Sequence, residues 1–281
     1  MTGAARRPPL SKDTRLCISL AGRPSNIGTR FHNHLYDVLG LDFLYKAFTT
    51  TDITAAIGGV RALGIRGCSV SMPFKQDVLA LVDEVEPSAR AINAVNTIVN
   101  DVTVSGGRLT ASNTDYLAVQ RLIAEHGLEP AAPVLIRGSG GMAAAVGSAF
   151  RDAGFRTGTI VARNRTTGAE LADRLGYGYI DDVGSRTAAV IVNVTPVGMA
   201  GGPQERDSAF GTETIARAET VFDVVAMPSE TPLITAARDA GKPVITGAEV
   251  IALQAAEQFE RYTGVRPTPG QIAEASAISR A

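Results

Sequence analysis

The most constraining feature of this sequence is a glycine-rich turn at residues 137–143, which follows an apolar run and opens a stretch of small residues. Gly138, Gly140 and Ala143 have the spacing G-x-G-x-x-G/A of a strand–turn–helix unit that binds a dinucleotide. Glycines allow a tight turn and a close approach of pyrophosphate, and the unpaired N–H groups of the helix start favour an anion. The residues predicted to hold the cofactor here are Gly138, Ser139, Gly140, Gly141, Met142 and Ala143.

Composition narrows the class of protein. The chain has 281 residues, of which 45% are hydrophobic, so it can form one large or two modest domains. A net charge of -1 gives no footprint for nucleic acid or an anionic membrane, and no apolar run approaches the roughly 20 residues of a membrane span. Cys17 and Cys68 lie in apolar runs and indicate reduced core residues of a cytoplasmic protein. The first nine residues predict a frayed tail, not a signal peptide.

The first half of the chain alternates strands with helices. Apolar runs predict strands at 16–21, 41–48, 67–71 and 91–99, with helices at 29–39 and from Thr51 or Asp52 to about 63. Asn93 and Asn96 lie inside the predicted strand 91–99, and a last run leads into a helix near 113–115. This order predicts an α/β domain with a mostly parallel sheet.

From residue 133 the pattern restarts around the glycine turn. Strands are predicted at 157–162, 188–194, 220–225 and 243–246, and helices at 167–175 and 231–240. Two final helices, 248–262 and 268–278, have no strands of their own and are expected to pack back on the first domain. The predicted fold is α/β with a substrate domain at 1–116, a Rossmann-type domain at 117–247 and C-terminal helices at 248–281. The cleft between domains is the expected ligand site.

Lys75 and Asp115 are the charged candidates for chemistry. Pro73 suits the first turn of a helix, so the pattern places Lys75 at a helix opening beside a strand end. A lysine there can donate a proton to a carbonyl or accept one from an alcohol, although most lysines are solvated surface groups. Asp115 is its natural partner, although an aspartate in a first helical turn also favours the helix dipole. Both interpretations stay open for each residue.

Several amides in apolar surroundings are candidates for ligand binding. Asn93, Asn96 and Asn113 lie in or beside predicted strands, and Gln254 is a lone polar residue in an apolar helical stretch. Buried amides need hydrogen-bond partners. Those partners are either the backbone and a neighbouring helix, or the hydroxyl groups of a substrate.

The turn after strand 157–162 indicates the type of dinucleotide. An NAD site typically has a carboxylate in this turn that binds the ribose hydroxyls, and residues 162–167 contain no carboxylate. The alternative to a cofactor site is a basic turn followed by a helix cap at Thr166 or Thr167. Charge-assisted donors favour a 2′-phosphate and hence NADP(H), and the turn supplies Arg163, Asn164, Arg165 and Thr166.

The histidines are not expected to bind a metal. His32 and His34 flank Asn33 on a predicted helix, with no cysteine or carboxylate at ligand spacing. They are interpreted as polar helix residues, one of them near the cleft.

The motifs taken together resemble those of the shikimate dehydrogenase family, in the family's order, from about residue 22 to about residue 264. The matching segments are 70–75 (Val-Ser-Met-Pro-Phe-Lys), 94–97, 113–115, 138–143, 164–166, 193–199 and 254–256. The resemblance implies a two-domain shikimate 3-dehydrogenase that reversibly reduces 3-dehydroshikimate with NADPH. Lys75 and Asp115 would act on the hydroxyl that becomes the ketone.

The resemblance also implies the remaining contacts. The nicotinamide would lie near Val224 and Gly247. The partners implied are a small cyclic hydroxy acid and no macromolecule, with a monomer or homodimer as the assembly. The residues implied for the ring hydroxyls are Asn96, Asp115 and Gln254, with Ser71 in the position of the family's substrate-binding threonine.

The departures from the family pattern concern the substrate's carboxylate. Where the family has Ser-x-Ser-Pro, this chain has Asn26, Gly28 and Thr29, and Ala226 stands in place of a tyrosine. Asn26 and Thr29 are therefore the predicted carboxylate ligands of a shikimate dehydrogenase-like subgroup, with Ser25 and Arg23 as alternatives. The alternatives are a quinate/shikimate dehydrogenase that uses NAD, and a ligand-sensing homologue without catalysis.

Overall fold

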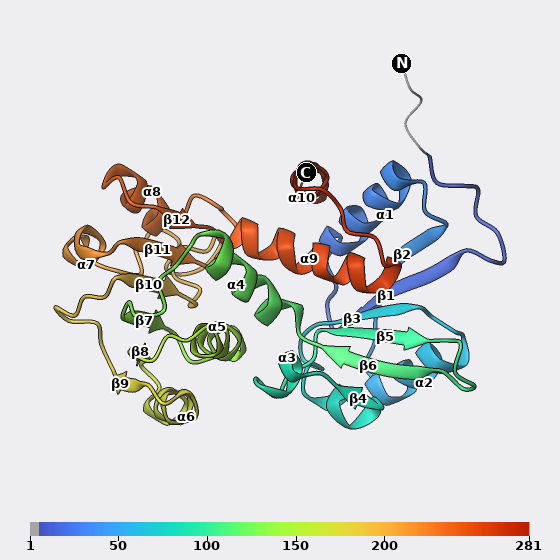
Figure 1. Cartoon of the computed structure of the whole chain (residues 1–281), viewed down its shortest axis with the longest axis horizontal. Helices are drawn as coiled ribbons and strands as arrows, with labels where there is room; N and C mark the ends of the chain where they lie inside the picture. The colour runs from blue at the N-terminus through green and yellow to red at the C-terminus, as the bar shows by residue number, and fades with distance from the viewer. Residues whose placement is uncertain (1–5, 281) are drawn as a thin grey trace, which may run out of the picture. The chain divides into compact units, whose positions relative to one another are not determined.

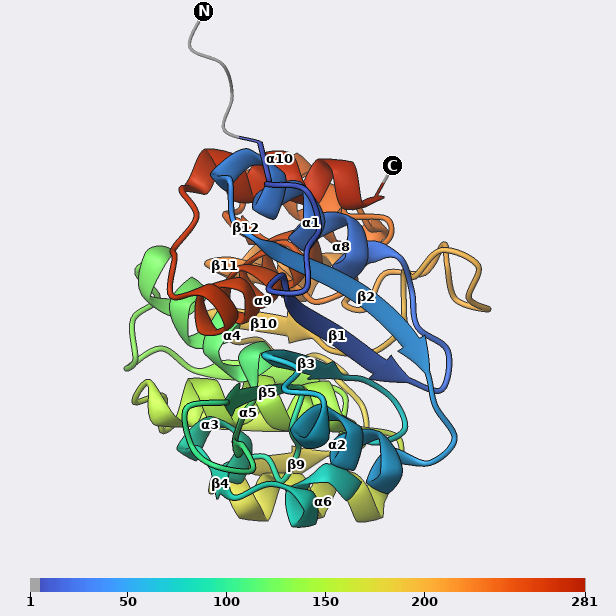
Figure 2. The same cartoon turned by 90° about the vertical axis from the view of Figure 1, so that its right-hand side faces the viewer.

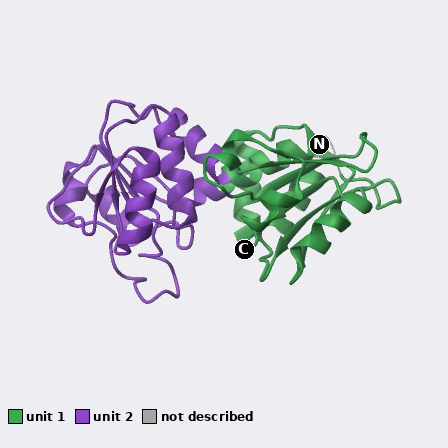
Figure 3. Ribbon diagram, turned by 90° about the horizontal axis from the view of Figure 1, so that it is seen from below, with its two compact units in different colours: residues 1–114, 252–281 green, residues 115–251 purple. Residues whose placement is uncertain are grey.

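The computed structural model describes residues 6–280, so the first five residues of the predicted tail lie outside it. The chain divides into two compact units (Figure 1, Figure 3). Unit 1 comprises the residues up to Thr114 and those from Ala252 onward, and unit 2 comprises Asp115–Ile251. The domain limits expected from the sequence, at 116/117 and 247/248, remain a prediction.

Unit 1 contains a mixed six-stranded sheet in the order β2-β1-β3-β5-β6-β4. β1 pairs in parallel with β2 and β3, β4 pairs in parallel with β6, and β5 runs antiparallel to both of its neighbours. The strands are β1 Arg15–Ala21, β2 Phe43–Thr49, β3 Gly67–Val70, β4 Glu84–Val85, β5 Thr97–Asp101 and β6 Arg108–Ser112.

Two helix ends in unit 1 lie where the local sequence predicts them. Asp52 caps α2 by accepting a hydrogen bond from the Ala55 N–H, and Gly40 ends α1 with a left-handed φ of 65°, which suits glycine. The helical segments are α1 Ile27–Leu39, α2 Ile53–Ala62, the 3-10 helix η1 Asp77–Leu81, α3 Pro87–Arg90, α4 Thr114–Glu125, α9 Gly247–Thr263 and α10 Pro269–Arg280. α4 and α9 each cross the limit between the units.

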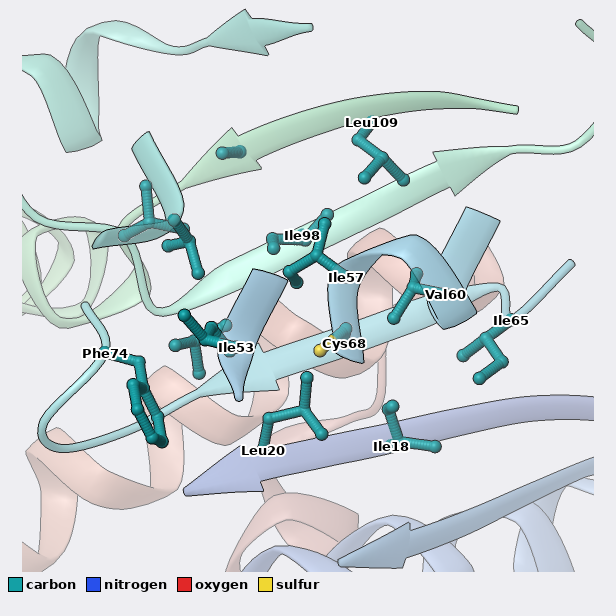
Figure 4. Packing of buried hydrophobic residues seen from close by; sticks show 14 of the residues in the cluster. Ile18, Leu20, Ile53, Ile57, Val60, Ile65, Cys68, Phe74, Ile98 and Leu109 are labelled. Carbon is teal, nitrogen blue, oxygen red and sulfur yellow. The ribbon is translucent and has the colours of Figure 1, made fainter. Parts of the chain in front are cut away.

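One core of unit 1 lies between α2 and the sheet (Figure 4). Ile53, Ile57 and Val60 recur at helical spacing and pack with Cys68 and Ile98, so α2 buries one apolar face. Cys17 and Cys68 are both buried free thiols. Burial raises the pKa of Cys17 to about 12, which keeps it a neutral thiol.

A second core of unit 1 holds α1, α9 and α10 against the other side of the sheet (Figure 2). His32 belongs to this core, with no exposed surface, and stacks on Tyr45 with ring centroids 4.4 Å apart. Burial lowers the pKa of His32 to about 3, so the imidazole is neutral. The interpretation of His32 as a polar helix residue was therefore wrong, because its ring packs as an aromatic core residue. The Nε2 atom of His34 lies 3.6 Å from Oε1 of Glu274.

Unit 2 contains a six-stranded sheet in the order β12-β11-β10-β7-β8-β9, with every pair parallel. This is the strand order of a Rossmann-type sheet. The strands are β7 Val134–Arg137, β8 Gly158–Val161, β9 Gly178–Ile180, β10 Val190–Asn193, β11 Thr220–Asp223 and β12 Val244–Ile245. The helices are α5 Gly141–Asp152, α6 Arg165–Leu175, α7 Thr212–Arg217 and α8 Pro232–Asp239.

Two local predictions in unit 1 were wrong. Lys75 does not open a helix, because residues 72–76 form turns and the Lys75 carbonyl accepts from the Val95 N–H at 2.7 Å. Asn93 and Asn96 do not lie inside a strand, since α3 and a turn precede β5. Asn93 adopts a φ of 53°, a left-handed conformation that asparagine tolerates better than most residues.

No helix in the described part of the chain is both long enough and apolar enough to cross a membrane.

Candidate functional site

The glycine turn of unit 2 joins β7 to α5. Gly138 has a φ of 131° and donates a hydrogen bond to the Val161 carbonyl at 2.8 Å. A Cβ on Gly138 would lie 2.7 Å from Cγ2 of Val194, so both conformation and space require glycine there. The first glycine of the motif thus serves the fold of the turn.

The next two glycines face open space. A Cβ on Gly140 or Gly141 would meet no atom within 4 Å. Gly140 is the N-cap of α5 and supplies no side-chain cap, so the first N–H groups of the helix lack intrahelical acceptors. Ala143 is fully buried, which lets α5 pack closely behind the turn. Open space in front of unpaired N–H groups is what a bound pyrophosphate requires.

A pocket of about 380 Å³ opens beside this turn. The turn and the start of α6 are joined across it, because the hydroxyls of Ser139 and Thr167 are 2.7 Å apart. The predicted cofactor residues Gly138, Ser139, Arg163 and Asn164 all line the pocket. The other lining residues are Arg137, Val161, Ala162, Asp181, Asp182, Thr195, Pro196, Val197 and Gln204.

The basic turn starts α6. Asn164 is the N-cap, and its Oδ1 accepts from the Thr167 N–H at 3.2 Å. The alternative cap at Thr166 or Thr167 was therefore wrong, because Asn164 already accepts the hydrogen bond of the first helical turn. Arg165 and Thr166 lie in that turn and are exposed. Donors and positive helix dipole converge here, which suits a phosphate.

Arg137 is a half-buried cation at the same pocket. Its guanidinium donates to the Ala209 carbonyl. Burial lowers the pKa of Arg137, the charge of Asp182 raises it, and the charge of Arg163 lowers it. The pocket therefore brings arginines and aspartates close enough to influence one another.

A buried network fixes the loops that follow β10 and β11. Asp223 accepts hydrogen bonds from Asn193 Nδ2 at 3.0 Å, from the Val225 N–H at 3.0 Å and from Thr231 Oγ1 at 2.7 Å. Asn193 Oδ1 accepts from the N–H and hydroxyl of Thr195, at 3.0 and 2.6 Å. Thr195 lines the pocket, so this network holds one of the pocket walls.

Asp223 should make stability depend on pH. Burial raises its pKa to about 6, above the roughly 3.9 of an unfolded aspartate. Its stabilising contribution is thus full below pH 3.9 and lost as pH rises through 6. Relative to Asp223→Asn, the wild type should gain about 2–3 kcal/mol between pH 7.5 and pH 4. Urea unfolding of both proteins at each pH measures this, and a difference that stays constant with pH would contradict it.

Val224 and Gly247 meet at the end of β11. A Cβ on Gly247 would collide with the backbone of Val224 and Val225, so only glycine lets α9 start this close to the strand. Val224 is half-buried, and neither residue is among those that line the 380 Å³ pocket.

The predicted substrate residues of unit 1 centre on Asn96, whose exposed fraction is 2%. Its Oδ1 accepts from Thr97 Oγ1 and from the Thr114 N–H, both at 2.8 Å. Its Nδ2 is buried without a hydrogen-bond acceptor among the described residues. Gln254 Nε2 donates to Thr114 Oγ1 at 3.3 Å, which places it in the same cluster. A buried donor without an acceptor is a candidate ligand contact.

Backbone hydrogen bonds bring Ser71 and Lys75 to this cluster. The Val70 N–H donates to the Asn96 carbonyl at 2.9 Å, and the Val95 N–H donates to the Lys75 carbonyl at 2.7 Å. Residues 71–75 therefore run alongside the segment that ends in Asn96. Asp115 is in the first turn of α4, directly after Thr114.

The predicted carboxylate ligands lie at the start of α1. Asn26 is its N-cap and is exposed, and its side chain makes no capping hydrogen bond. The hydroxyl of Thr29 is buried without a described partner. The loop before α1 adjoins the Lys75 segment, because the Gly22 N–H donates to the Met72 carbonyl at 3.1 Å.

Sequence reasoning missed several pocket residues, above all Arg137, Asp181 and Asp182. The two aspartates follow β9, a three-residue strand too short to produce an apolar pattern. The position of Arg137 at the end of a predicted strand was the available signal, since carboxyl ends of parallel strands carry ligand sites. Within residues 6–280, no cluster of three or more His, Cys, Asp or Glu side chains could hold a metal ion.

The two sheets and their connections define a two-unit α/β protein with a Rossmann-type unit. A model of the shikimate dehydrogenase substrate binding domain matches residues 26–98. A shikimate dehydrogenase-like protein of Haemophilus influenzae is 56% identical over 271 residues, covering 96% of this chain and 98% of the relative. The chain belongs to the shikimate dehydrogenase family.

Solved structures agree with the fold. A shikimate 5-dehydrogenase-like protein matches with a TM-score of 0.94 and 56% identity, over 97% of this chain and 100% of that one. Shikimate 5-dehydrogenase of Thermus thermophilus, in complex with NADP(H) and shikimate, matches with a TM-score of 0.82 and 28% identity, over 94% and 99%. Further relatives carry the name shikimate dehydrogenase (NADP(+)).

Proposed function

We propose that this chain is an NADP(H)-dependent oxidoreductase that interconverts 3-dehydroshikimate, or a close cyclic keto acid, and the corresponding alcohol. The observation that carries the proposal is the pocket of unit 2, where open glycines, unpaired helix N–H groups and a basic turn adjoin. NADP complexes of family members support it. Bound NADPH would supply the hydride.

The cofactor's anionic groups have distinct proposed contacts. The pyrophosphate would face Gly140 and the N–H groups of Gly141, Met142 and Ala143, where a Cβ on Gly140 would enter open space. The 2′-phosphate would bind Arg163 and Arg165, with Thr166 and the Asn164 amide as further donors. The nicotinamide would lie near Val224 and Gly247.

Lys75 and Asp115 are proposed to handle the proton. In the reducing direction the Lys75 ammonium would donate a proton to the carbonyl oxygen, and in the oxidising direction the neutral amine would accept it from the hydroxyl. Asp115 would hold the same hydroxyl and orient it. This assignment uses a lysine whose segment is hydrogen-bonded to the Asn96 segment.

The ring hydroxyls are proposed to bind Ser71, Asn96, Asp115 and Gln254. Nδ2 of Asn96 is a buried donor that a substrate hydroxyl would satisfy, and leaving it unmet costs about 1–3 kcal/mol. The acid would bind at the start of α1 through Asn26 and Thr29. Because Asn26 and Gly28 replace the two serines there and Thr29 replaces the proline, shikimate itself would fit imperfectly.

Steady-state rates on shikimate, quinate and aminated analogues test the proposal. We expect slow turnover of shikimate and a preference for an analogue altered at the acid or its neighbouring ring position. The double variant Asn26→Ser/Gly28→Ser should raise kcat/KM for shikimate about tenfold. One restored hydrogen bond to the carboxylate is worth about 1.4 kcal/mol, which corresponds to a tenfold change. A Cβ on Gly28 lies 3.4 Å from the Tyr45 hydroxyl, so the fold tolerates it. Shikimate as the best wild-type substrate by a wide margin would contradict the rebuilt acid site.

A further inference from the structure

The pocket of unit 2 has an end that the phosphate contacts do not explain. The glycine turn and the basic turn both line it, and the lining also includes Asp181 and Asp182. Carboxylates repel phosphate groups, so an aspartate in this pocket suits a different group of the ligand. The hydrogen-bond donors of a dinucleotide suit such a carboxylate.

The strand register places these aspartates. β8 and β9 pair Val161 with Ile180, and the Ala162 N–H donates to the Ile180 carbonyl at 3.1 Å. The chain then leaves both strands at the same edge of the sheet, so Arg163 and Asp181 follow neighbouring strand ends. The adenosine half of a dinucleotide bound at this glycine turn extends towards those strand ends.

The two aspartates have different surroundings. Asp182 acts electrostatically on Arg137, whose guanidinium is held by the Ala209 carbonyl. Asp182 therefore balances a half-buried cation of the pocket. Asp181 is exposed and lines the pocket as well, which leaves its carboxylate to the ligand.

We propose that Asp181 accepts a hydrogen bond from the exocyclic amine of adenine, and so makes this site selective for an adenine dinucleotide. The inference rests on the proposed NADP(H) function and adds a residue that reads the base. The pocket lining also includes Pro196, whose ring offers an apolar surface to the base, and Gln204. Repulsion by Asp181 also directs the 2′-phosphate to the Arg163 side.

Hypoxanthine dinucleotide phosphate, deamino-NADPH, is the matched probe, because it has a carbonyl oxygen where adenine has an amine. Wild type should bind NADPH about tenfold more tightly than deamino-NADPH in a fluorescence titration. The hypoxanthine carbonyl and the Asp181 carboxylate are both hydrogen-bond acceptors, so neither can donate to the other. Asp181→Asn should bring the ratio to within about twofold, because its amide can donate to that carbonyl. Asp173→Asn, on α6 outside the pocket, is the control and should keep the wild-type ratio.

Three results would overturn the assignment. Equal wild-type affinity for the two nucleotides would show that no acceptor reads the amine. An unchanged ratio in a folded Asp181→Asn protein would place the acceptor elsewhere. A change in the NADPH/NADH ratio, without a change in the deamino ratio, would move Asp181 to the ribose. Binding of neither nucleotide by wild type would instead contradict the cofactor assignment, and this inference with it.

Discussion

Replacing Lys75 by alanine is expected to lower kcat at least ~10³-fold while nucleotide and substrate binding change little. A positioned general acid contributes about 10²–10⁴ to the rate, and among residues 6–280 no backbone hydrogen bond ties another lysine to the Asn96 segment. Removing the ammonium would leave the proposed hydroxyl contacts of Asn96 and Gln254 in place. Steady-state kinetics and isothermal titration with each ligand separate the two effects.

Lys75→Arg and Lys46→Ala sharpen this test. Arginine keeps the charge but holds its proton at any working pH, so Lys75→Arg should also lose turnover while still binding ligand. Lys46 is exposed on β2, and its removal should leave both properties unchanged. Substantial turnover in Lys75→Ala would show that another group moves the proton.

The second large effect concerns the glycine turn. Gly140→Ala should fold normally and bind NADPH at least tenfold more weakly, because its methyl group enters the space proposed for pyrophosphate. Gly138→Ala should instead lower the free energy of unfolding by about 1–3 kcal/mol through its backbone conformation alone, because the φ of residue 138 is 131°. The added Cβ would also collide with the side chain of Val194. Thermal unfolding with and without NADPH distinguishes the two.

Gly270→Ala supplies the control for a glycine-to-alanine change in open space. It lies in α10, where a Cβ would meet no atom within 4 Å. Neither its unfolding temperature nor its NADPH affinity should fall. If Gly140→Ala behaves like Gly270→Ala, the pyrophosphate does not approach this turn.

The elements predicted well are those whose signals are local. The end of α1 at Gly40, the cap of α2 at Asp52 and the glycine turn each depend on residues within a few positions, so the sequence alone indicates them. Two-unit α/β architecture follows from the same repeated strand and helix signals.

What could not be predicted depends on partners distant in sequence. Residues 72–76 looked like a helix start, but their carbonyls accept from Gly22 and Val95. His32 looked polar, but Tyr45 and the residues of α9 surround it. β9 is too short for a periodic pattern, so the aspartates behind it went unnoticed.

The candidate site shows the same division. The types of residue at the cofactor turn were predictable because one loop carries the anion-binding geometry. The unpaired Nδ2 of Asn96 could not be predicted from the sequence. It depends on the fold, which brings Thr97 and Thr114 to the Oδ1 of the same amide and leaves Nδ2 without an acceptor among the described residues. The roles of Lys75, Asp115 and the α1 residues stay predictions.

Isotope transfer tests whether hydride passes directly from NADPH to the substrate's carbonyl carbon. Wild type is incubated with the best keto acid of the substrate panel and NADPH that carries deuterium at either face of nicotinamide C4. We expect one of the two labelled forms to give an alcohol with a single deuterium on the former carbonyl carbon, in an amount equal to the NADPH oxidised. Failure of every keto acid to acquire deuterium from either form would contradict it.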